Sequence, residues 1–134
     1  MRPEPAREGR RWLTQAENDL AFAELAARER FFAQACFNAQ QAAEKALKAF
    51  LYGQGAEQVL GHSVAELVGE CAQLDRHFVA LRDRVAPLDQ FYLATRYPNS
   101  LPGGIPAEAF GEPDAGRALE MAAEALRTVS RLLR

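Results

Sequence analysis

The chain has 134 residues, of which 49% are apolar and 25% are charged, and its formal net charge is -2. These values are typical of one soluble globular domain, spanning 1–134, that is large enough to bury its own core. They exclude a chain that is basic throughout, as many nucleic-acid-binding domains are, but they leave room for a local basic patch.

The N-terminal segment, residues 1–11, is charged and contains two prolines, and no apolar run follows it that a signal peptide would need. No stretch approaches the ~18 consecutive apolar residues of a membrane span. We therefore expect a cytoplasmic protein with no membrane partner.

Apolar residues at helical spacing predict a first helix from about Arg7 to Arg28 and a second from about Arg30 to Tyr52. The second helix is apolar over more than one narrow stripe, as a central helix would be. Phe31, Phe32 and Phe37 lie on three different sides of it. Because one monomer core cannot easily bury all three rings, we expect a homodimer interface to cover the surplus.

A third helix is predicted to begin after Ser63, because Ser63 and Glu66 form the pattern of a capping box. Its expected buried face consists of Val64, Leu67, Val68, Cys71 and Leu74. The segment from Arg76 to Tyr97 also has helical spacing, but Pro87 should break it into two pieces.

Residues 98–113 contain four prolines and three glycines, which predicts a long irregular loop that is either functional or mobile. A last helix is expected from about Asp114 to Leu133, with Asp114 as its N-cap. No strand pattern is present. The predicted fold is therefore all-α, an antiparallel up-and-down bundle of four to five helices.

Cys36 and Cys71 are far apart in the sequence and neither belongs to a CxxC motif. With only His62 and His77 besides, a structural metal site lacks ligands, so we expect two buried thiols, no metal and no cofactor.

Several short runs together resemble one known family. They are residues 16–20 (AENDL), residues 39–49 (AQQAAEKALKA), the glycines at 53 and 55, residues 62–64 (HSV), Tyr92, and residues 96–98 (RYP). This set is similar to the HEPN domain, named for higher eukaryotes and prokaryotes nucleotide-binding. The resemblance covers nearly the whole chain and implies a bundle of four or five helices that commonly dimerises.

The resemblance also implies a function. Members often accompany a minimal nucleotidyltransferase as a toxin–antitoxin pair, and many are metal-independent RNases whose motif is an Arg followed, after four to six residues, by a His. Two copies of that motif meet across the dimer. Here no Arg–His pair has this spacing, because neither His62 nor His77 has an arginine five to seven positions before it. RNA cleavage needs a group that moves a proton near neutral pH, which arginine cannot readily do.

Arg96 is the first candidate for phosphate or nucleotide binding, because a guanidinium pairs bidentately with phosphate. The alternative is a helix-end cation that satisfies the last carbonyls. Tyr97 could stack on a base, although we favour a ring that covers the core. A partner nucleotidyltransferase would have Tyr92 or Tyr97 as possible acceptors of its nucleotidyl group.

Lys45 and Lys48 are the only lysines and share a helical stripe with Gln41 and Tyr52. They are further candidates for phosphate binding, but we favour a solvated face with a Glu44–Lys48 pair. His62 precedes the third helix, where a role in capping or loop packing is the simpler interpretation. It is nevertheless the first candidate for a proton carrier near Arg96.

We therefore favour a nucleotide- or phosphate-binding regulatory module, a partner of a minimal nucleotidyltransferase, over an enzyme. The first alternative is an RNase toxin that uses Arg96 with a non-standard proton carrier. The second alternative is an interaction domain without a ligand. Loss of Arg96 would abolish the function of the binding module and that of the RNase, and it would leave the interaction domain unaffected.

Overall fold

The computed structural model describes residues 4–133, which form helices and connecting segments without a strand. The predicted all-α bundle is confirmed. In chain order the α-helices are α1 (Pro5–Arg28), α2 (Phe32–Gly53), α3 (Val64–Leu74), α4 (His77–Val85), α5 (Pro106–Ala109) and α6 (Glu112–Leu132), and the 3-10 helices are η1 (Ala86–Phe91) and η2 (Pro98–Ser100).

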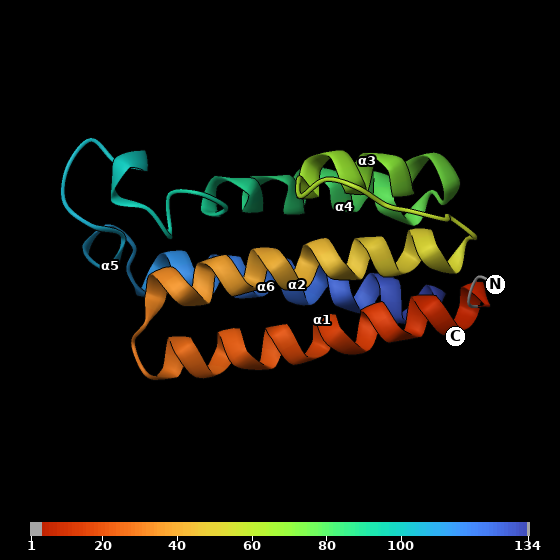
Figure 1. Ribbon diagram of the computed structural model, residues 1–134, viewed down its shortest axis with the longest axis horizontal. Coiled ribbons are helices and arrows are strands. Elements are labelled where there is room, and N and C mark those ends of the chain that lie inside the picture. The colour runs from red at the N-terminus through yellow and green to blue at the C-terminus, as the bar shows by residue number, and fades with distance from the viewer. Residues whose placement is uncertain (1–3, 134) are drawn as a thin grey trace.

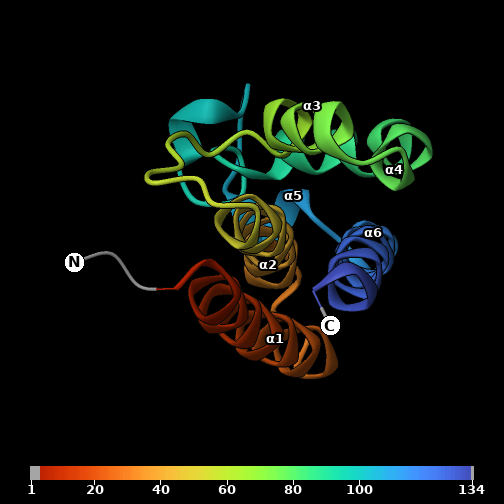
Figure 2. The same ribbon diagram turned by 90° about the vertical axis from the view of Figure 1, so that its right-hand side faces the viewer.

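Helix α2 is the centre of the bundle (Figure 1, Figure 2). It packs against α1, α6, α3 and η1, and 14 of its 22 residues are buried. Half of the buried residues are alanines, which allow the helix axes to approach closely. The broad apolar surface predicted for this segment is thus explained by neighbours on several sides.

Helices α3 and α4 form a second layer with η1 on the side of α2 away from α1 (Figure 2). The predicted cap of α3 is confirmed, since the Glu66 amide donates to the Ser63 hydroxyl at 3.1 Å. Four of the five expected apolar positions are buried, but Leu74 is 59% exposed. The predicted break at Pro87 is also confirmed, because α4 ends at Val85 and Pro87 lies in the first turn of η1.

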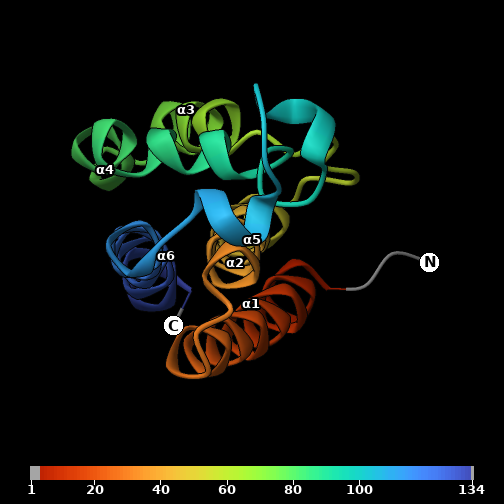
Figure 3. The same cartoon turned by 90° about the vertical axis from the view of Figure 1, so that its left-hand side faces the viewer.

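The segment 98–111 crosses the end of the bundle, where α5 contacts α2 (Figure 3). It is irregular apart from η2 and α5, so the prediction of one uninterrupted loop needs that correction. The predicted N-cap of the last helix is wrong by three positions. Gly111 is the N-cap, and Asp114 lies inside the first turn, where its carboxylate accepts a hydrogen bond from the Gly111 amide at 2.9 Å.

Cys36 and Cys71 are both buried free thiols, as predicted. Burial is the main cause that raises the pKa of each thiol to about 12. A thiolate is the reactive form of cysteine, so both side chains are inert in the folded protein. None of the helices within residues 4–133 is long and apolar enough to cross a membrane.

The close approach of α1 and α2 depends on Gly9. A Cβ at this position would lie 2.9 Å from the Ala49 carbonyl oxygen and 3.1 Å from the Gly53 Cα. Both are backbone atoms that cannot rotate away, so Gly9→Ala should lower the free energy of unfolding by about 1–3 kcal/mol. Urea denaturation measures the change.

Gly116→Ala is the matched control, because a Cβ at this helical position meets nothing within 4 Å. It should raise the free energy of unfolding by about 0.5–1 kcal/mol through helix propensity alone. Equal stabilisation by both substitutions would contradict the close α1–α2 contact.

Candidate functional site

Arg96 lies just beyond η1, against a group of aromatic rings. Its guanidinium carbon is 4.4 Å from the ring centre of Phe37, 4.8 Å from that of Tyr92 and 5.1 Å from that of Tyr97. The rings attract the cation and restrict its motion. Arg96 is exposed, and it makes no ion pair with any residue from 4 to 133.

The backbone also orients Arg96. Its Nε donates a hydrogen bond of 2.9 Å to the Tyr92 carbonyl, four residues earlier. This is the helix-end contact that was the alternative interpretation of Arg96. It uses one of the five N–H groups of the guanidinium, so the presence of this contact still leaves donors for an external anion.

His62 joins the same cluster from the loop before α3. Its ring stacks on that of Tyr92, with centres 5.4 Å apart and planes inclined by 17°. Tyr92 therefore contacts both His62 and Arg96, which are far apart in the sequence. The His62 side chain is 61% exposed, and its contact with Tyr92 brings it into the same aromatic cluster as Arg96.

Glu44 lies behind His62. The Nδ1 atom of His62 is 3.3 Å from both carboxylate oxygens of Glu44, whose side chain is only 4% exposed. Lys48 and Gln41 contact the same carboxylate at 3.2 and 3.3 Å. A carboxylate at Nδ1 favours the tautomer that leaves Nε2 as the acceptor, so the second ring nitrogen suits proton transfer.

The main chain of His62 is held as well. The side chain of Gln40, which is fully buried, donates to the His62 carbonyl at 2.9 Å. Its Oε1 accepts a hydrogen bond from Nε2 of the Gln41 side chain at 2.8 Å. Both the backbone and the ring of His62 are thus bonded to one edge of α2. The sequence contained a signal for these bonds from α2, because Gln40 and Glu44 are polar residues one turn apart on an otherwise apolar edge of the helix.

Asp89 connects η1 to the start of α3. Its carboxylate accepts hydrogen bonds from the Ser63 hydroxyl at 2.7 Å, the Val64 amide at 2.7 Å and the Ala65 amide at 3.1 Å. It satisfies donors that have no partner within the helix. Asp89 thus connects the segment that carries Tyr92 to the start of α3, directly after His62.

The remaining predicted site residues are placed differently. The expected Glu44–Lys48 pair is confirmed at 3.2 Å, but both residues are buried, so the expectation that this pair lies on a solvated face is wrong. Lys45 is partly exposed and bonds Asp19 at 2.6 Å. Tyr97 is 49% exposed, which corrects the expectation that it covers the core. Among residues 4–133, no three His, Cys, Asp or Glu side chains are grouped to hold a metal ion.

The sequence matches the HEPN domain family over residues 10–132, which is most of the chain. The protein belongs to the HEPN family. A solved structure of TT1696 from Thermus thermophilus is 34% identical, with a TM-score of 0.83 over 92% of this chain and 97% of that one.

Two further HEPN structures are similar. The archaeal homologue ST0689 is 33% identical, with a TM-score of 0.77 over 95% of this chain and 98% of that one. The HEPN domain protein tm0613 from Thermotoga maritima is 31% identical, with a TM-score of 0.71 over 92% of this chain and 97% of that one. The search of curated proteins gave no match. The three structures each cover at least 92% of this HEPN domain.

Asp89 offers a test of how this HEPN domain positions the cluster. Asp89→Ala leaves three donors at the start of α3 without their acceptor, so it should lower the free energy of unfolding by about 1–3 kcal/mol. Asp83→Ala, at an exposed position of α4, is the control and should change it by less than about 0.5 kcal/mol. Thermal and urea denaturation measure both, and equal effects would refute the anchoring role.

Proposed function

We propose that this HEPN domain binds the phosphate group of a nucleotide at Arg96. The observation that carries the proposal is a guanidinium fixed against three aromatic rings without a carboxylate partner among the described residues. Arginine side chains on protein surfaces are usually mobile, and a fixed guanidinium loses less entropy when it binds phosphate bidentately.

The rings around Arg96 favour a nucleotide over a free phosphate. Tyr97 is about half exposed, and His62 presents most of its ring beside Tyr92. Aromatic faces of this kind stack on bases, while arginine holds the backbone. Lys45 is close in sequence to Glu44 but is bonded to Asp19, so it contributes only if that ion pair opens.

The proposed role is that of a regulatory module, assembled as a homodimer and paired with a nucleotidyltransferase. Exposed apolar side chains close in sequence to His62 and Tyr92 support a protein contact there: Leu60 and Leu93 are 74% and 53% exposed. Phe31, which is 59% exposed, supports a further contact. Light scattering tests the dimer, and co-purification with a neighbouring nucleotidyltransferase, followed by mass spectrometry for an adduct on Tyr92 or Tyr97, tests the partner.

Nucleotide binding can be measured by calorimetry with AMP, ATP and GTP. Arg96→Ala should weaken binding roughly tenfold to a hundredfold, which is the loss of affinity expected when one charge-assisted hydrogen bond to phosphate is removed. Arg96→Lys should recover part of the affinity, because lysine keeps the charge and loses the bidentate geometry. Arg76→Ala, an exposed arginine outside the cluster, is the control. If all four proteins bind equally or not at all, the interaction domain without a ligand is the better description.

RNA cleavage is the second candidate function, and the contact between Glu44 and His62 favours it. His62 Nε2 is suited to accept the proton of a ribose 2′-hydroxyl as this oxygen attacks the phosphorus, and Arg96 to stabilise the negative charge that develops on the non-bridging phosphate oxygens. The bond from phosphorus to the 5′-oxygen breaks, and the departing 5′-oxygen takes the proton back from His62, which leaves a 2′,3′-cyclic phosphate. Tyr92 lies against both side chains. The contacts of His62 and Arg96 with Tyr92 support this candidate, although the two residues lack the spacing of the family motif.

Incubation with total RNA in the presence of EDTA tests this candidate. We expect cleavage by the wild type, with rates reduced roughly 10²- to 10⁴-fold in His62→Gln and in Arg96→Ala. His77→Gln is a matched control, because His77 is also exposed and its Nδ1 also lies against a carboxylate, that of Asp75 at 2.6 Å. Cleavage that survives in His62→Gln, or that is absent from the wild type, removes this candidate.

A further inference from the structure

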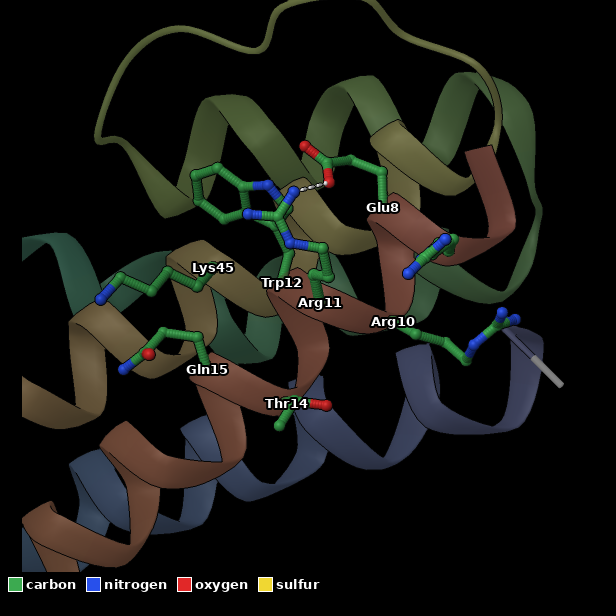
Figure 4. Close-up of a pocket in the computed structure, with 8 residues that line it drawn as sticks. Glu8, Arg10, Arg11, Trp12, Thr14, Gln15 and Lys45 are labelled. Carbon is green, nitrogen blue, oxygen red and sulfur yellow. Dashed lines mark hydrogen bonds and ion pairs between the residues drawn. The ribbon is translucent and has the colours of Figure 1, made fainter. Parts of the chain in front are cut away.

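A wide hollow of about 1120 Å³ lies beside the first turns of α1 (Figure 4). Arg7 and Arg10 line it, but Arg10 points to the side of the helix opposite Trp12, and Arg11 is bonded to Glu8 at 2.7 Å. Pockets that enclose a small molecule have volumes of about 300–1,000 Å³, and this hollow is larger and open to solvent. It therefore lacks the walls that would surround a ligand.

A smaller groove of about 350 Å³ lies where α4 and η1 face α6 (Figure 2). One wall consists of Arg84 from α4 and of Pro87 and Gln90 from η1. The other wall consists of side chains of α6 between Arg117 and Glu124. Its volume is at the small end of the range for small-molecule pockets, and it shares no residue with the aromatic cluster around Arg96.

The groove contains charges of both signs that are only partly paired. Arg117 bonds Asp114 through one Nη atom at 2.6 Å, and Arg84 approaches Glu124 through Nε at 3.0 Å. Each guanidinium has five N–H groups, so both keep free donors. Glu120 makes no ion pair with any residue from 4 to 133, and its carboxylate is exposed. An unpaired carboxylate thus lies beside donors that can still bind an anion.

Glu124 gives a second indication of a ligand. Its Oε2 atom is buried and receives no hydrogen bond from the described residues. Arg84 Nε is 3.0 Å from this oxygen, but its N–H does not point at it in hydrogen-bond geometry. A buried carboxylate oxygen without a donor is unfavourable, so this wall of the groove lacks one positively charged donor.

The apolar members of the lining are Pro87 and Met121. The thioether of methionine is flexible and polarisable, so it adapts to apolar groups of different shape. The groove therefore suits a small molecule that combines a positive charge, a negative charge and an apolar part. A purely anionic molecule would face Glu120, and a purely cationic one would face the two arginines.

We propose that this groove binds a free α-amino acid with an apolar side chain. The free N–H groups of Arg84 and Arg117 bind its carboxylate, and Glu120 and the Oε2 atom of Glu124 accept from its ammonium group. Arg84 is 59% exposed, so it turns from Glu124 toward the carboxylate and leaves Oε2 to the ammonium.

The spacing on α6 agrees with this assignment. Arg117 and Glu120 are three residues apart, so they are neighbours on the helix surface. The carboxylate and the ammonium of an α-amino acid are attached to one carbon atom and need partners that lie this close together. The apolar side chain then lies on Pro87 and Met121.

Calorimetric titration of the protein with L-leucine and L-phenylalanine tests the proposal. The wild type should bind both at one site per chain. Glu120→Gln should weaken binding roughly tenfold, because it removes the charge that pairs with the ammonium and keeps the shape of the side chain. Glu17→Gln, at an exposed carboxylate of α1 outside the groove, is the matched control and should bind like the wild type.

Two derivatives distinguish a free amino acid from the end of a protein chain. L-leucinamide keeps the ammonium without the carboxylate, as an N-terminal residue does, and N-acetyl-L-leucine keeps the carboxylate without the ammonium, as a C-terminal residue does. Each should bind at least roughly tenfold more weakly than L-leucine. Glu120→Gln should not weaken the binding of N-acetyl-L-leucine further, because that ligand has no ammonium group to lose.

The proposal is overturned if neither amino acid binds the wild type, or if Glu120→Gln binds them as Glu17→Gln does. Binding of either derivative as tightly as L-leucine would also overturn it, and a chain end would then be the occupant of the groove. Arg96→Ala should bind L-leucine like the wild type. A loss of nucleotide binding in that variant is therefore separate from a failure of amino-acid binding.

Discussion

The buried carboxylate of Glu44 is the constraint on which the site depends. A charge with 4% exposure is costly unless several partners satisfy it, and here Lys48, Gln41 and His62 do so from two different segments. Because His62 is one of these partners, the loop before α3 is bonded to α2. The position of His62 then determines where Tyr92 can stack, and Tyr92 in turn determines where Arg96 lies.

The alanines of α2 make this arrangement possible. Small side chains bring α1 and α6 close to α2, and at Gly9 the backbone of α1 meets the Ala49 carbonyl and Gly53 directly. Such close packing leaves little room to move one helix without the others. Gln40 and Glu44 on α2 are therefore held at a fixed distance from the second layer. A site whose residues come from both layers requires such a fixed distance.

Arg96 lies beyond η1, whereas Arg7 and Arg10 lie on α1, and the two groups differ in how their charge is held. Arg96 is restrained by rings and by a backbone carbonyl, as suits recognition of one phosphate in one orientation. Arg7 and Arg10 are exposed on α1 without ion pairs among the described residues.

The sequence by itself determined the features that depend on near neighbours. The helical periodicity, the Ser63 cap and the break at Pro87 follow from contacts within a few residues, and the family resemblance follows from short runs. The Asp114 cap was misplaced because a carboxylate at the third helical position bonds the same backbone amide from inside the helix. Only the tertiary structure brought His62 and Arg96 against the same ring, that of Tyr92, and decided that Lys48 is buried and Tyr97 is exposed. Each of these depends on how two layers pack, because burial and contact between distant segments are properties of the assembled core and not of local spacing.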